Sequence, residues 1–473
     1  MPYTLIILFV ISLVSNLVYN AYLPLHVDEA YYWIWTKNPQ LSYFDHPPMA
    51  AYFIKIATLF SAQEWSIHLG AVIAMSLTCL LIYQLAENLF SPEAATYSFI
   101  IFLFLPLTQL GHQVMTPDPP LLLFWTSTLY FVYKAVFQQQ QHCWYWAGIS
   151  GGLMLLSKYT GILLLPGLFL FLTTTRYRSL LGTKGPYTAI LLGLLVFSPV
   201  IIWNWQHDWS SFAYQFNHGM AEQRIFNPAT LGEFIGGQLG LANPVFFLTM
   251  LYYTLTKIRQ NTQQEKLAFL FWPFIFSLAF FTYTAMFKKA EANWPAPAYI
   301  TGSLLLGYWL AQQQKKRLIA IGLLLSILLL TLVRLPEIFP VLPKELILKK
   351  QYLGYSNIME SASSYIVPGH TLVLSDSYQN ASMAWYYLEG QPSVYILTTA
   401  PPSNFDYWQA QLAGKTIREA VYIGSPEKLP QLEQLFTTVV LLDTLVYQDN
   451  YITRSLSIYR CNQLKSPLLS GPK

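Results

Sequence analysis

The sequence predicts an α-helical polytopic membrane protein with a small α/β domain at its C-terminal end. Hydrophobic residues make up 54% of the 473 residues and charged residues only 11%, whereas an ordinary soluble domain carries roughly 25% charged residues. Apolar runs of about 20 residues, the length that crosses a bilayer, recur as far as about residue 335. The net charge of +4 is small and scattered, so no nucleic-acid partner is expected.

About eleven apolar runs are the predicted membrane spans. They cover 4–22, 67–87, 94–112, 119–137, 143–157, 160–175, 186–205, 234–256, 267–287, 296–312 and 318–335. The fifth and sixth are short and separated by only three residues, so they form either a tight hairpin or one broken helix. The first run lacks the basic segment and the small-residue cleavage site of a signal peptide, so we expect it to remain as a span.

The basic residues predict the orientation of these spans. With a cytoplasmic N-terminus, Lys and Arg cluster in loops assigned to the cytoplasm, as in 176–184, 257–266 and 315–317, in agreement with the positive-inside rule. Most acidic residues then fall on the opposite side, and an odd number of spans places the C-terminal domain there. We therefore expect a multi-pass protein of the bacterial inner membrane with a periplasmic C-terminal domain.

Two domains are predicted. Residues 1–336 form the transmembrane domain, whose outer loop 23–66 carries the densest group of ionisable and aromatic residues. Residues 337–473 begin with a linker punctuated by prolines and continue as the α/β domain. Its expected strands are 371–374, 394–397, 421–423, 438–442 and 456–459, and its expected helices lie near 379–388 and 425–435.

Asp28 and Glu29 follow the first span and precede an aromatic-rich segment, 31–35. Acids at this point are either ordinary first-turn acids of a helix, favoured by its macrodipole, or a source of a general base. An aromatic, partly dehydrated setting makes a carboxylate a better proton acceptor for a hydroxyl. Adjacent residues point to different sides of a helix, so one acid can face a site while the other caps or pairs.

A rigid turn with the sequence YFDHPP follows at 43–48. Its prolines restrict the backbone and disfavour helix at His46. Asp45 beside the His46 imidazole suits either a metal-ligand pair or contact with a phosphate; the plainer alternative is a turn that starts the next helix at one of the prolines. Tyr43 is a candidate substrate-binding residue, because aromatic rings stack on sugars.

Two polar residues lie at the predicted outer ends of later spans. Asp118, in a turn flanked by prolines, is either the N-cap of the following helix or part of a site. Lys158 is basic on the side where acids predominate. It either holds a phosphate or extends its ammonium to the membrane interface.

The loop after the seventh span contains His207, His218 and Arg224. The two histidines, together with Asp45, are the candidate ligands of a divalent metal ion. Arg224 is a candidate phosphate-binding cation. The alternative of an ordinary polar surface loop stays open.

The loop that precedes the tenth span reads KKAEANWPAP at 288–297. Lys289 is a second basic exception on the acidic side and suits a lipid phosphate, while Asn293 and Trp294 are candidate substrate-binding residues. All of these clusters are expected on one membrane face. Together, their carboxylates, cations, histidines and aromatic rings favour the transfer of a sugar from a lipid phosphate.

At these residues the chain resembles the GT-C membrane glycosyltransferases, a group that includes protein O-mannosyltransferases, aminoarabinose transferases and Rgt-type galacturonosyltransferases. The resemblance covers residues 5–310 and rests on the order and spacing of the Asp28-Glu29 pair, the turn 43–48, Asp118, the LSKY segment at 156–159 and the segment 289–297. It implies a GT-C fold and an inverting transfer from a polyprenyl-phosphate sugar to a lipid, glycan or protein acceptor.

The resemblance also implies residue roles. Asp28 would be the catalytic base, with Glu29 beside it. The leaving polyprenyl phosphate would be stabilised by cationic groups, here Lys158, Lys289 and Arg224, with His46 as a further candidate. Aminoarabinose transferases carry Glu-Lys where this chain has Asp45-His46, and this departure is what opens the metal role at that turn.

Two other classes of function remain as alternatives. A transporter or lipid-linked sugar flippase would carry charges near the bilayer midplane and often paired repeats, whereas this chain has its charges at the outer rim. A structural or sensory membrane protein would use the C-terminal domain to bind a partner. The sequence specifies neither the sugar nor the acceptor.

Overall fold

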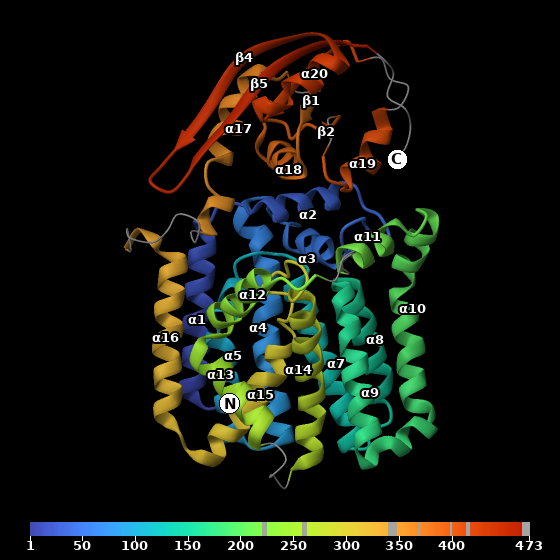
Figure 1. Cartoon of the computed structure of the whole chain (residues 1–473), viewed down its shortest axis with the longest axis vertical. Helices are drawn as coiled ribbons and strands as arrows, with labels where there is room; N and C mark the ends of the chain where they lie inside the picture. The colour runs from blue at the N-terminus through green and yellow to red at the C-terminus, as the bar shows by residue number, and fades with distance from the viewer. Residues whose placement is uncertain are drawn as a thin grey trace. The chain divides into compact units, whose positions relative to one another are not determined.

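The computed structural model describes residues 1–219, 225–257, 263–338, 348–367, 369–397, 400–412 and 417–465. The chain forms two compact units (Figure 1). The first, here called the membrane unit, comprises Met1–Ala21 and Gln40–Leu332, and the second, the α/β unit, comprises Tyr22–Pro39 and Val333–Lys473. Residues 22–39 therefore fold with the C-terminal part of the chain rather than with the spans that flank them in the sequence.

The membrane unit consists of helices packed around an apolar core to which α4, α5, α7, α14 and α15 contribute. The elements, in chain order, are α1 (Tyr3–Ala21), α3 (Met49–Ala57), α4 (Glu64–Leu89), α5 (Pro92–Phe104), α6 (Pro106–Gly111), α7 (Asp118–Phe137), α8 (Cys143–Ser157), η1 (Tyr159–Leu163), α9 (Leu164–Thr174), η2 (Arg176–Gly182), α10 (Lys184–Gln206), α11 (Ser210–Gly219), α12 (Pro228–Ala242), α13 (Pro244–Tyr252), η3 (Tyr253–Lys257), α14 (Gln264–Ala285), α15 (Ala298–Gln313) and α16 (Lys316–Arg334).

Six of the described helices are long and apolar enough to cross a membrane, and the number rises to eight if each of two sharply bent pairs is one span. The predicted multi-pass helical architecture is therefore confirmed, whereas these lengths do not confirm eleven spans. Part of the difference comes from proline. The predicted run 94–112 is divided into α5 and α6 at Leu105, because the residue before a proline disfavours the helical conformation.

The predicted span 234–256 is not one continuous helix. α12 ends at Ala242, and the two helices on either side of Asn243 are bent by 104° relative to each other. Asn243 has a φ of 65°, which ends the helix, and Pro244 then starts α13. The buried Asn243 side chain accepts a hydrogen bond from the N–H of Val245 at 2.9 Å and donates to Gly322 O at 2.6 Å and Ser326 Oγ at 2.8 Å. The corner is thereby tied to α16.

α8 and α10 approach each other through small residues. Gly148 and Gly152 lie four positions apart on α8, and Gly193 faces them from α10. A Cβ atom at Gly152 would lie 2.5 Å from the Cβ of Val196 and 2.7 Å from Gly193 O, so a larger residue would force the helices apart. Small residues at this spacing are typical of helix pairs that pack inside a membrane.

The α/β unit contains a five-stranded sheet in the order β2-β1-β3-β5-β4. β1 pairs in parallel with β2 and β3, and β5 pairs antiparallel with β3 and β4. Its main elements are α2 (Val27–Lys37), α17 (Tyr355–Ala362), β1 (Leu372–Ser375), α18 (Tyr378–Tyr387), β2 (Val394–Ile396), α19 (Phe405–Trp408), β3 (Glu419–Gly424), α20 (Leu429–Leu435), β4 (Phe436–Gln448) and β5 (Thr453–Leu464). The predicted small α/β domain is confirmed; β4 and β5 form a hairpin longer than expected (Figure 1).

α2 joins the α/β unit through an aromatic face. The ring of Tyr31 lies 4.9 Å from that of Tyr378 and 6.0 Å from that of Phe405, measured between centroids. The Tyr31 hydroxyl accepts a hydrogen bond from the N–H of Asn404 at 2.8 Å, and Trp33 meets Tyr386 edge-on at 5.0 Å. The aromatic residues that follow Asp28 in the sequence are therefore the face by which α2 is held.

Candidate active site

Asp28 and Glu29 lie in the first turn of α2 and have different surroundings. Glu29 is fully buried, and its Oε2 accepts a hydrogen bond from the N–H of His26 at 3.3 Å. The His26 Nδ1 in turn accepts one from the N–H of Asp28 at 3.2 Å. This reciprocal capping satisfies donors at the helix N-terminus. The Asp28 side chain remains 34% exposed, so Asp28 is the acid that can meet a substrate.

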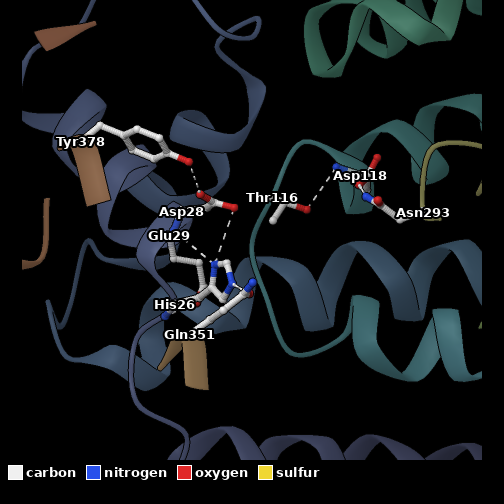
Figure 2. A network of polar contacts seen from close by, with 8 residues as sticks. All are labelled: His26, Asp28, Glu29, Thr116, Asp118, Asn293, Gln351 and Tyr378. Atoms are coloured by element: carbon white, nitrogen blue, oxygen red, sulfur yellow. Dashed lines mark hydrogen bonds and ion pairs between the residues drawn. The ribbon is translucent and has the colours of Figure 1, made fainter. Parts of the chain in front are cut away.

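Two side chains from the C-terminal part of the chain contact Asp28 and His26 (Figure 2). The Tyr378 hydroxyl donates to Asp28 Oδ1 at 3.2 Å, while Asp28 Oδ2 lies 3.7 Å from His26 Nδ1. Because His26 Nδ1 accepts from a backbone N–H, the ring proton resides on Nε2, which donates to Gln351 Oε1 at 2.5 Å. The Asp28 carboxylate thus has two neighbours within the α/β unit, the Tyr378 hydroxyl that donates to it and the nearby His26 ring.

The membrane unit brings together Lys158, Asp118 and Asn293. The Lys158 ammonium donates to Asp118 Oδ1 at 2.6 Å. The Asn293 amide donates to Asp118 Oδ2 at 2.6 Å, and Figure 2 shows these two residues. The side chains of Lys158 and Asp118 are only 9% and 16% exposed. Among the described residues this is the most buried of the Lys or Arg ion pairs. The three residues come from the start of α7, the end of α8 and the loop before α15.

The local structure explains how these ends meet. Pro117 occupies the N-cap position of α7, and the Asp118 side chain makes no capping bond, so the alternative of Asp118 as a helix cap is wrong. Asp118 instead accepts from Lys158 and Asn293. Lys158 is the extended residue that ends α8, with φ −157° and ψ 137°. Because it leaves the helix there, its side chain can reach back to the start of the neighbouring antiparallel helix.

α12 holds the backbone beside Asn293. Gln238 Nε2 donates to Ala292 O at 3.0 Å, and Gln238 Oε1 accepts from the Tyr299 hydroxyl at 2.5 Å. A Cβ atom at Gly237 would lie 2.5 Å from the Ala292 Cβ, so α12 packs closely on this loop. Gln238 thus holds the residue next to Asn293, which donates to Asp118.

Lys289 and Trp294 contact residues other than Asp118 and Lys158. The Lys289 ammonium pairs with Glu291 at 3.0 Å, and its side chain is 69% exposed; the hydrogen bond and charge of Glu291 raise the pKa of Lys289. Trp294 packs against Phe281, with ring centroids 5.8 Å apart. Their expected roles in donor and substrate binding stay predictions.

The turn 43–48 is tied to α11. The carbonyl of Asp45 accepts a hydrogen bond from Gln215 Nε2 at 2.6 Å, and the rings of Phe44 and Tyr214 lie 4.7 Å apart. Tyr43 is buried, with its hydroxyl accepting from the Gln40 N–H at 3.2 Å, and burial raises the pKa of Tyr43. Pro48 is the N-cap of α3, so the turn also starts a helix, while the role of His46 stays a prediction.

Of the three expected metal ligands, the structure describes the side chains of Asp45 and His207. His207 stacks on Trp203 at 4.0 Å, and its Nδ1 donates to the Trp203 carbonyl at 2.7 Å. The side chain of His218 and all of Arg224 lie outside the described residues. Within the described ranges, no three or more His, Cys, Asp or Glu residues are grouped as a metal ion requires. The divalent metal ion therefore stays a prediction.

Sequence reasoning missed His26, Gln351 and Tyr378. His26 carried a signal that could have been used, because its spacing from Glu29 is that of a capping pair. Gln351 and Tyr378 are 325 and 350 positions from their partners. Only knowledge that α2 folds with the C-terminal part of the chain could have identified them.

Comparisons with known proteins agree with this architecture. Residues 45–203 match the family described as Dolichyl-phosphate-mannose-protein mannosyltransferase. Over 448 residues the chain is 25% identical to the lipid A galacturonosyltransferase RgtD of Rhizobium johnstonii, and the alignment covers 92% of each protein.

Two solved structures are similar in fold. The crystal structure of ArnT from Cupriavidus metallidurans bound to undecaprenyl phosphate matches with a TM-score of 0.69 and 13% identity, over 99% of both chains. The archaeal oligosaccharyltransferase AglB from Archaeoglobus fulgidus, in complex with an inhibitory peptide and a dolichol-phosphate, matches with a TM-score of 0.53 and 11% identity, over 96% of this chain and 74% of that one. The resemblance to GT-C membrane glycosyltransferases and the GT-C fold are therefore confirmed.

Proposed function

We propose that this GT-C membrane protein is an inverting glycosyltransferase that moves a sugar from a polyprenyl-phosphate donor to a lipid, glycan or protein acceptor at the outer face of a bacterial inner membrane. Within that range, a lipid acceptor has the strongest support. The similarity to the lipid A galacturonosyltransferase RgtD extends over 92% of both proteins. For the donor, support comes from the fold shared with ArnT, which was crystallised with undecaprenyl phosphate.

The observation that carries the proposal is the division of roles between Asp28 and Glu29. Glu29 is buried as a cap, whereas Asp28 stays 34% exposed and is available as a general base. In the proposed reaction the Asp28 carboxylate takes the proton of the acceptor hydroxyl. The hydroxyl oxygen bonds to the anomeric carbon, the carbon–oxygen bond to the phosphate breaks, and the polyprenyl phosphate leaves with the bonding electrons. A single displacement of this kind inverts the anomeric centre.

Lys158 is the proposed main contact of the donor phosphate. An ammonium has three N–H donors, and in the described part of the chain Lys158 gives one of them to Asp118. The remaining donors suit a phosphate oxygen, on which negative charge grows as the bond to the sugar breaks. Asp118 and Asn293 then orient the ammonium. Lys289, with its exposed side chain, is the proposed second cation.

The test is substitution of Asp28 by Asn in the full-length protein. Lipid A from a deletion strain that carries the variant is compared by mass spectrometry with that from a strain carrying the wild-type protein. We expect loss of the modification by about 100-fold or more, the range for removal of a general base. Asp443→Asn is the matched control, because Asp443 also accepts a hydrogen bond from a tyrosine, Tyr365, at 2.8 Å. An Asp28→Asn protein with wild-type transfer would refute the proposal.

A divalent metal ion at the turn of Asp45, with His207 and His218, is a separate proposal. It is supported by the ligand types and by the contact between the turn and α11. Exhaustive chelation followed by a transfer assay tests it. Unchanged transfer of the sugar in metal-free buffer would refute a role of the metal ion in the reaction.

A further inference from the structure

We infer that the α/β unit supplies two positioning residues for the proposed base: Tyr378, which orients the Asp28 carboxylate, and Gln351, which sets the tautomer of His26. The inference rests on the proposed role of Asp28. It gives the C-terminal part of the chain a role in the reaction that acts through Asp28. All four residues belong to one compact unit, and their contacts appear together in Figure 2.

Tyr378 is held firmly at the first position of α18. Ser377 caps this helix by accepting from the N–H of Asn380 at 3.3 Å. The buried Asp376 accepts from Ser377 Oγ at 3.1 Å, from Asn380 Nδ2 at 2.8 Å and from the N–H of Ser425 at 2.8 Å. The Tyr378 ring packs on that of Tyr31 at 4.9 Å. Both the backbone and the ring of Tyr378 are therefore fixed before its hydroxyl meets Asp28.

The hydroxyl of Tyr378 distinguishes the two carboxylate oxygens. It donates to Asp28 Oδ1 at 3.2 Å, and this bond selects one orientation of a side chain that is one-third exposed and would otherwise rotate. Oδ2 is left as the oxygen that receives the acceptor proton. A base held in one orientation avoids the entropic cost of finding it in each turnover.

Gln351 keeps the second oxygen available. By accepting from His26 Nε2 at 2.5 Å, it favours the tautomer in which Nδ1 has a lone pair and no proton. Nδ1 lies 3.7 Å from Asp28 Oδ2. A proton on Nδ1 would be attracted to Oδ2 and would compete with the acceptor hydroxyl, whereas the lone pair cannot. Gln351 thus prevents His26 from blocking the base.

The first test is Tyr378→Phe, which keeps the ring and removes the hydroxyl. We expect kcat to fall about tenfold, equivalent to about 1.4 kcal/mol, with the KM for the donor lipid changed less than about twofold. Tyr365→Phe is the matched control, since it removes a tyrosine-to-carboxylate hydrogen bond of 2.8 Å in the same unit, to Asp443. It should leave both constants unchanged. The assay uses full-length protein in nanodiscs, polyprenyl-linked sugars extracted from membranes, and lipid A.

The second test is Gln351→Glu against Gln351→Leu. A carboxylate beside Nε2 favours the doubly protonated imidazole, so Gln351→Glu should lower kcat more than Gln351→Leu does. Conversion of His26 to Asn in the Gln351→Glu background should then restore kcat, because the competing proton is gone. This rescue is not expected from a loss of folding, and melting temperatures of all variants provide the check.

The outcomes separate the inference from the proposed function. If Asp28→Asn abolishes transfer but Tyr378→Phe behaves like Tyr365→Phe, the inference is overturned while the proposed function stands. A rise in KM for the donor with unchanged kcat also overturns it, since Tyr378 would then bind substrate. If Tyr378→Phe does not fold, the Gln351 variants decide: equal kcat for Glu and Leu at that position overturns the inference. Retained activity in Asp28→Asn defeats the proposed function itself.

Discussion

Replacement of Asp118 by Asn leaves Lys158 as a buried cation without a carboxylate. The two side chains are 9% and 16% exposed, so water can compensate only in part. Removal of one partner of a buried ion pair costs about 3–5 kcal/mol. Because the asparagine can still accept a hydrogen bond, we expect a loss near the lower end, about 3 kcal/mol. With an unfolding entropy of ~2.1 cal/mol/K per residue, the 473 residues convert this loss into a fall in Tm of about 3 °C.

The assay is thermal unfolding of the purified protein in nanodiscs, with and without undecaprenyl phosphate. If Lys158 receives the donor phosphate, the lipid should stabilise Asp118→Asn more than it stabilises the wild type, since the phosphate replaces the lost carboxylate. The double variant Asp118→Asn, Lys158→Met is the control. It should recover most of the lost Tm, because no charge remains buried. A wild-type Tm in Asp118→Asn, or a double variant less stable than the single one, would refute the reasoning.

Substitutions at Gln238, Asn243 and Gly152 test the framework of the membrane unit. Gln238→Leu should release the Ala292 carbonyl and lower the affinity for the donor several-fold. Gln238→Glu keeps an acceptor for the Tyr299 hydroxyl, so its affinity for the donor should fall less. Titration of each variant with undecaprenyl phosphate measures these affinities. Asn243→Ala removes three hydrogen bonds, two of them buried, and should cost about 2 kcal/mol, seen as a lower Tm. Gly152→Leu should separate α8 from α10 and cost about 3 kcal/mol, seen as a lower Tm, while Gly182→Ala, with no atom near its would-be Cβ, should be silent.

The sequence predicted the features that depend on local patterns. Apolar runs placed α1, α4, α7 and α14 to within a few residues, because the length and composition of a span are local properties. The strands of the α/β unit followed in the same way from their alternation and turn residues. The bend at Asn243 was missed, since an apolar window does not register a single residue with positive φ.

The candidate site was predictable only by residue type. Lys158, Asp118 and Asn293 were each chosen from local signals, and the structure brings them together. Their pairing with one another, rather than with a substrate, follows from the antiparallel packing of α7 and α8, which the sequence does not encode at any fixed spacing. Tyr378 and Gln351 were harder to predict, because their contacts depend on which unit α2 belongs to. The assignment of α2 to the α/β unit is a long-range property of the whole chain.

The membership of α2 in the α/β unit has a consequence for biosynthesis. α2 is made early, but its partners on α18 and α19 are made more than 300 residues later, as the separation of 350 positions between Asp28 and Tyr378 indicates. β5, which lies between β3 and β4 in the sheet, is later still. Long-range contacts of this kind form slowly, and they form after the local contacts. A nascent chain would therefore insert its spans well before its proposed base is in position. A product truncated before β5 would be inserted in the membrane but would not catalyse transfer.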